Sequence, residues 1–148
     1  MRKSVFAAAV LALTGLAGSV SAGGQQISAE ASPDGKSVVV RTYRCGSPAS
    51  LSLNGTAEGL VGGERKSIPL KIGRAAEPGA FTVTRQWPVE GTWVLVFTAA
   101  GERSASALVE LLPGEKIRIA SQESTYERPS RQRIETALAG PTSRATAR

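Results

Sequence analysis

The sequence predicts an all-β protein: a single antiparallel, immunoglobulin-like β-sandwich of about seven strands with a flexible C-terminal tail. Three observations support this prediction. Apolar residues recur with a period of two in several short runs between residues 23 and 120. Turns that contain Gly or Pro separate these runs at intervals of about 8–12 residues, as in sandwich folds. No part of this region has the apolar period of a helix.

The strands can be justified in chain order. The predicted runs are residues 27–31, 37–44, 51–60, 68–72, 81–87, 92–98, 105–111 and 116–119. The second run is rich in β-branched residues, which favour strands. Pro69 cannot donate a ladder hydrogen bond, so its strand is expected at a sheet edge. The run 92–98 is apolar on both faces, which indicates a central strand, whereas Leu108 interrupts the alternation of the next run.

The first 22 residues have the pattern of a cleavable secretion signal. Two positive charges at the start precede an apolar run from Val5 to Leu16, and small residues lead to Ala22. A bilayer span needs about 20 consecutive apolar residues, and this run is shorter. The sequence therefore predicts an exported chain, periplasmic or secreted, that begins at Gly23 and has no stable membrane insertion after cleavage. The sandwich domain is expected over residues 23–120.

Composition excludes several chemistries. The chain has no His, its single Met is the initiator, and Cys45 is its only Cys. Without imidazoles or a second thiol, the usual nucleophile systems and zinc sites cannot be built, so we expect no metal, no cofactor and no intramolecular disulfide. Cys45 has two interpretations: a small buried residue near a strand end, which we favour, or a thiol activated by Arg41 and Arg44.

The net positive charge lies mainly at the two ends of the chain. Residues 23–117 carry ten Lys or Arg and nine Asp or Glu, whereas residues 118–148 carry six Arg and three Glu. Because the domain itself is nearly neutral, nucleic-acid binding is not expected.

Residues 121–148 are predicted to be a basic, largely disordered tail with a possible short helix at 130–139. Ser130 would cap this helix, and Ile134 and Leu138 would share one face. Two interpretations stay open. The segment either docks onto a partner through Arg131, Ile134 and Leu138, or it is a solvated tail.

The segment from Gly79 to Val96 is the most distinctive. Pro78 precedes it, and it contains Gly79-Ala80-Phe81 followed by Pro88-Val89-Glu90-Gly91-Thr92-Trp93. This pattern resembles small periplasmic immunoglobulin-like modules of the YtkA/FixH type, which are related to copper carriers of the CopC type. The resemblance implies a sandwich fold and an accessory role in the cell envelope. It does not imply copper binding, because the His and Met ligands of those modules have no counterpart here.

Together these observations predict a non-catalytic module that acts by protein–protein contact in the cell envelope or extracellular space, through an edge strand and the basic tail. No pair of carboxylates has the spacing of an acid–base site. The alternative is a glycan- or peptide-binding module in which Trp87, beside the Pro88 turn, and Arg85 contact the ligand.

Overall fold

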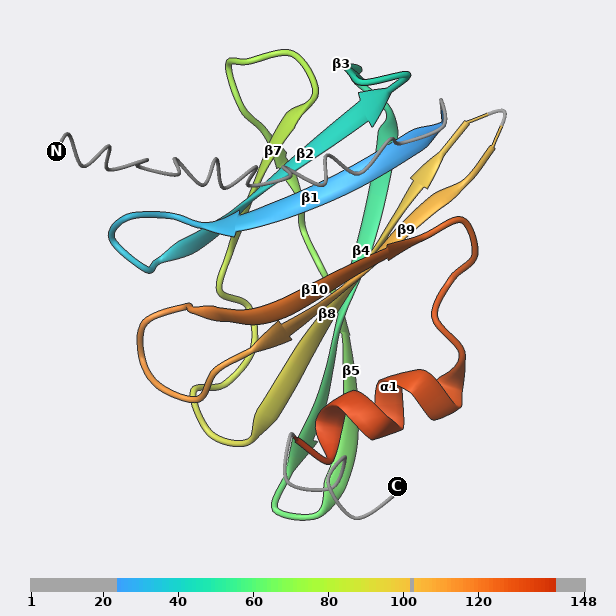
Figure 1. Ribbon diagram of the computed structural model, residues 1–148. Helices are drawn as coiled ribbons and strands as arrows, with labels where there is room; N and C mark the ends of the chain where they lie inside the picture. The colour runs from blue at the N-terminus through green and yellow to red at the C-terminus, as the bar shows by residue number, and fades with distance from the viewer. Residues whose placement is uncertain (1–23, 102, 141–148) are drawn as a thin grey trace, which may run out of the picture.

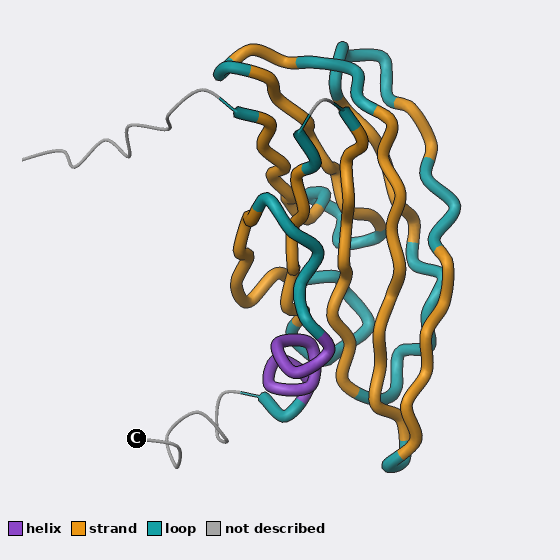
Figure 2. Tube along the Cα trace, turned by 90° about the vertical axis from the view of Figure 1, so that its right-hand side faces the viewer, coloured by secondary structure: helices purple, strands orange, loops and turns teal. Residues whose placement is uncertain are grey.

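The computed structural model describes residues 24–101 and 103–140, so the predicted secretion signal and residues 141–148 lie outside the described residues. Two antiparallel sheets of five strands each pack face to face (Figures 1 and 2). The predicted all-β sandwich is confirmed, although the described residues form ten strands rather than seven. No helix in the described part of the chain has the length and apolar character needed to cross a membrane.

The first sheet has the strand order β1-β2-β7-β6, and β3 pairs with β2. Its strands are β1 (Gln25–Ala31), β2 (Ser37–Arg44), β3 (Ser47–Pro48), β6 (Gly73–Arg74) and β7 (Ala80–Thr84).

The second sheet has the order β10-β9-β8-β4-β5. Its strands are β4 (Ser52–Val61), β5 (Glu64–Pro69), β8 (Thr92–Ala100), β9 (Ala105–Leu111) and β10 (Ile119–Thr125), and the helix α1 (Arg131–Leu138) follows them. The order confirms two predictions: β8 is the central strand of this sheet, and β5, which contains Pro69, is an edge strand.

Alternating apolar side chains from both sheets form the core. The first sheet contributes Val38, Val40 and Val83, and the second contributes Leu95 and Phe97, each of them fully buried. Because the strands alternate, the intervening side chains point to the outer faces of the two sheets.

Trp93 needs the space beside Gly59, its cross-strand neighbour on β4. A Cβ atom placed on Gly59 would lie 2.4 Å from Cζ3 of the Trp93 ring. The ring is 3% exposed, and its Nε1 donates to the carbonyl oxygen of Glu90 at 2.8 Å. Glycine is therefore the residue that lets this ring fill the space between the sheets.

The turn between β1 and β2 is held by Asp34. Its carboxylate accepts hydrogen bonds from Ser32 Oγ at 2.5 Å and from the backbone N–H of Lys36 at 3.0 Å. The Ser32 hydroxyl and then the Lys36 amide lower the pKa of Asp34 below its ordinary value, because both bonds stabilise the charged form.

One side of the sandwich is closed by the first and last strands, β1 and β10, which lie side by side (Figure 1). Gln122 Oε1 accepts from the backbone N–H of Ala29 at 2.9 Å, and Ser124 Oγ donates to the carbonyl of Ile27 at 2.7 Å. These side-chain bonds join the edges of the two sheets.

The C-terminal region differs from the prediction. β10 extends the sandwich beyond the expected boundary at residue 120, because its backbone pairs with β9 although its side chains are almost all exposed. The helix lies within the expected 130–139, with Ser130 Oγ accepting from the Arg133 N–H at 3.1 Å as its N-cap. Up to residue 140 the predicted disordered tail is therefore folded onto the domain.

Cys45 is exposed, so the expectation of a buried residue is wrong. Cys45 and Gly46 connect β2 to β3, with φ angles of 50° and 79°. A two-residue hairpin turn of type I′ has positive φ at both central positions, and this turn places the thiol at the surface.

Candidate functional site

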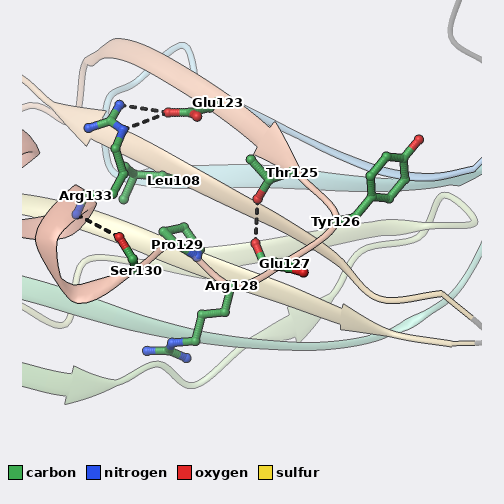
Figure 3. Close-up of a pocket in the computed structure, with 9 residues that line it drawn as sticks. All are labelled: Leu108, Glu123, Thr125, Tyr126, Glu127, Arg128, Pro129, Ser130 and Arg133. Carbon is green, nitrogen blue, oxygen red and sulfur yellow. Dashed lines mark hydrogen bonds and ion pairs between the residues drawn. The ribbon is translucent and has the colours of Figure 1, made fainter.

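A cleft of about 440 Å³ lies on the outer face of the second sheet, between β10 and α1 (Figure 3). We call residues 126–130, which connect β10 to α1, the linker. Leu108 of β9 lines the cleft from the sheet, and Glu123 and Thr125 line it from β10. The linker and Arg133 of α1 complete the lining.

The helix lies beside this cleft because the outer face of the second sheet is partly apolar. Val94, Val96 and Leu108 point away from the core between the sheets. They form a separate apolar cluster with three residues of α1, which are Ile134, Ala137 and Leu138, all at most 6% exposed. Burial of an isoleucine or leucine side chain contributes about 1.5–3 kcal/mol. An isolated eight-residue helix is marginal in water, so this contact stabilises it.

Ion pairs fix the direction of the helix. Arg133 contacts Glu123 at 2.8 Å and Glu110 at 3.3 Å (the Glu123 pair is drawn in Figure 3). On the other side of the helix, Glu135 accepts from Arg65 at 2.8 Å. Because these pairs are partly exposed, each contributes at most about 1 kcal/mol. They contribute more to the orientation of α1 than to its stability.

The linker carries two side chains that are more than half exposed. Tyr126 is 58% exposed, and the Arg128 side chain is 55% exposed. The two project in different directions from the linker (Figure 3). The Tyr126 ring lies over Gly24, where an added Cβ would come within 3.1 Å of the ring. Arg128 lies 3.8 Å from the carboxylate of Glu58.

The cleft is lined mainly by polar and charged side chains. It offers two guanidinium groups, carboxylates, hydroxyls and one phenol, so it can donate and accept hydrogen bonds. Among residues 24–101 and 103–140, no group of three His, Cys, Asp or Glu side chains could hold a metal ion. The Glu123 carboxylate is paired with the Arg133 guanidinium at 2.8 Å.

Trp87 and Arg85 lie away from this cleft. The Trp87 ring is 3% exposed and belongs to the core. The guanidinium of Arg85 lies 5.5 Å from the ring centroid, and its Nη2 donates to the carbonyls of Gly114 and Glu115 at 3.0 and 3.1 Å. The hollow beside them holds about 10 Å³, too little for a ligand. This geometry counts against the prediction that Trp87 and Arg85 bind a ligand, since both serve packing and loop attachment.

The three predicted docking residues do not lie on one surface. Ile134 and Leu138 are buried against the second sheet of their own chain, whereas Arg131 is exposed. Ile134 and Leu138 do share one apolar face of the helix, but the second sheet of the same chain already covers that face. This corrects the interpretation of α1 as a free segment waiting for a partner.

Sequence reasoning missed the residues that line the cleft, which include Tyr126, Arg128 and Arg133. One signal could have found them. Leu108 is apolar at a position where the alternation requires an outward-facing side chain. An outward leucine beside Val94 and Val96 indicates that another segment covers this face.

The chain matches no known protein-family model, and neither a curated protein nor a solved structure is significantly similar to it. Its resemblance to the YtkA/FixH-type modules therefore stays a prediction.

Proposed function

We propose that this protein is a non-catalytic, exported β-sandwich module that acts by protein–protein contact in the cell envelope or extracellular space. The contact is made through the cleft between β10 and α1. One observation carries the proposal. Tyr126 and Arg128 stand more than half exposed at the cleft, on a linker whose two ends are held by β10 and α1. Tyrosine and arginine are enriched among the residues that dominate binding energy at protein interfaces.

The anchored linker supports this function for a further reason. Side chains on a fixed backbone lose less conformational entropy on binding than those of a disordered tail. The charges of the cleft are mixed, with arginines and glutamates on its lining. Such a surface suits a polypeptide partner with complementary charges, because complementary charge gives specificity and speeds association.

The contact can be tested with a double variant, Tyr126→Ala with Arg128→Ala, used as bait in an envelope extract after chemical crosslinking. The matched control is Leu112→Ala with Arg74→Ala. Both of these side chains are exposed and neither lines the cleft. The proposal expects the first variant to lose a crosslinked protein that the wild type and the control retain. Equal recovery by all three proteins would reject the cleft as the contact surface.

Export is tested separately by the intact mass of the full chain expressed in a bacterium. The expected product begins at Gly23, because Val20 and Ala22 occupy the positions that a signal peptidase requires to be small. Ala22→Phe should block this cleavage, whereas Ser21→Phe, at the intervening position, should not. Retention of residues 1–22 in the wild-type product would contradict the proposal.

A further inference from the structure

The outer face of the second sheet has the features of a receptor for an amphipathic helix. Val94 is the cross-strand partner of Glu110 on β9 and of Glu58 on β4, so one row of the face reads carboxylate, valine, carboxylate. The next row contains Leu108 and Val96 side by side. Both carboxylate residues are at most 8% exposed. An apolar strip flanked by two buried carboxylates favours a helix that carries both apolar and basic residues.

The helix α1 meets these requirements through contacts to several strands. Its apolar residues cover Val94, Val96 and Leu108, Arg133 pairs with Glu110 and Glu123, and Glu135 pairs with Arg65. The basic partner, Arg65 on β5, lies on one side of the helix. The two acidic partners, Glu110 on β9 and Glu123 on β10, lie on the other side. This arrangement selects both the sequence and the direction of the helix.

The linker contributes little to this recognition. It passes over the 440 Å³ cleft without filling it, and its Thr125–Glu127 hydrogen bond is local. Its contacts with the rest of the domain lie at Tyr126, whose carbonyl accepts from Ser104 Oγ at 3.1 Å and whose ring lies over Gly24, and at Arg128, which lies 3.8 Å from Glu58. Pro129 disfavours the helical conformation at Arg128, so the linker is biased toward an extended path. The helix would therefore make the same contacts if it came from another molecule.

We propose that this face binds α1 of a second copy of the chain, so that two chains exchange their C-terminal helices and form a symmetric dimer. Exchange of an identical element preserves its contacts and is a low-cost route to a dimer. The monomer and dimer differ in the linker path and in the entropy of association, so the dimer fraction rises with protein concentration. This inference goes beyond the proposed function and does not depend on it.

Charge reversal at one ion pair tests the exchange. Arg133→Glu in one chain places two negative charges together, because the new side chain faces its own Glu123. Glu123→Arg in another chain places two positive charges together, because the new side chain faces its own Arg133. In a mixed dimer each helix meets a face of opposite charge. We expect each variant alone to be monomeric by light scattering, and the mixture to contain a species of twice the chain mass. The matched control replaces the first variant with Arg131→Glu, an exposed helix position that leaves Arg133 in place. This chain should dimerise with itself as the wild type does, but an affinity tag on it should not recover the Glu123→Arg chain.

A mixture that stays monomeric, with both variants folded by circular dichroism, overturns the proposal. If either variant does not fold, a cysteine pair decides instead. One chain carries Val94→Cys and the other Ala137→Cys, positions from the same apolar cluster, both in a Cys45→Ser background. A disulfide between the two chains under mild oxidation supports the exchange. No disulfide above the level of a Val94→Cys and Arg131→Cys control pair overturns it.

Discussion

The packing of Trp93 against Gly59 gives a quantitative test of how the second sheet meets the core. In Gly59→Ala the new methyl group would lie 2.4 Å from Cζ3 and 2.5 Å from Cε3 of the indole. Ordinary carbon–carbon contacts are about 3.5–4.0 Å, so the ring must retreat by about 1 Å. It cannot move freely, because it is buried between the sheets and its Nε1 is bonded to the Glu90 carbonyl at 2.8 Å.

The expected loss of stability follows from these contacts. Overpacking of a core costs about 1–3 kcal/mol, and weakening the indole hydrogen bond adds up to about 1 kcal/mol. Alanine offsets about 0.5–1 kcal/mol of this by restricting the unfolded chain. The net prediction is a loss of about 2 kcal/mol in the free energy of unfolding. For a domain of this size that corresponds to about 8 °C in Tm.

Urea denaturation followed by tryptophan fluorescence measures this change. Gly73→Ala is the matched control, because Gly73 is an exposed strand glycine whose added Cβ would find its nearest atom, the Thr82 carbonyl oxygen, at 3.6 Å. The control should keep the gain of about 0.5–1 kcal/mol from restriction of the unfolded chain, with no overpacking to offset it. If Gly59→Ala were as stable as the wild type, or no less stable than the control, the close packing described for Trp93 would be refuted.

Three further predictions concern loop attachment, the helix and the turn. Arg85→Ala should lower the free energy of unfolding by about 1 kcal/mol in urea denaturation, because a partly exposed cation loses its two loop carbonyls and its contact with Trp87; an unchanged midpoint would contradict this. Leu138→Ala should weaken helix docking by about 2–3 kcal/mol, so that hydrogen exchange accelerates in α1 while β8 stays protected. Equal protection of α1 in variant and wild type would show that Leu138 does not anchor it. Cys45→Gly should raise the thermal midpoint through about 0.5–1 kcal/mol of relieved strain, because Cys45 has a φ of 50°; a lower midpoint would rule out strain at this turn.

The sequence predicts the sandwich well where one face of a strand meets the core. The alternation of Phe81 and Val83 and the two apolar faces of β8 are local patterns, and the pairing of the sheets follows from them. β10 is not predicted because its side chains are almost all exposed, so its sequence lacks the apolar alternation of a strand. Only its backbone pairing with β9 defines it.

The site is less predictable because it depends on contacts between distant residues. Val94 and Leu138 share one apolar cluster although 44 residues separate them, and an isolated helix of this length carries no sign of the face it will cover. The burial of Trp87 also depends on contacts with residues that are distant in the sequence. Its position beside Pro88 favours exposure, yet the ring is buried, and Arg85 bonds to the distant carbonyls of Gly114 and Glu115 across its face.

The contact between β1 and β10 at the side of the sandwich has a consequence for biogenesis. Ala29 and Gln122 are 93 residues apart, so the sandwich cannot close until nearly the whole domain has been synthesised. Contacts of such sequence separation form slowly, since the entropy of closing a long loop comes first. A chain exported as we propose would therefore stay open during passage through a narrow channel. Its last strand would complete the fold on the far side.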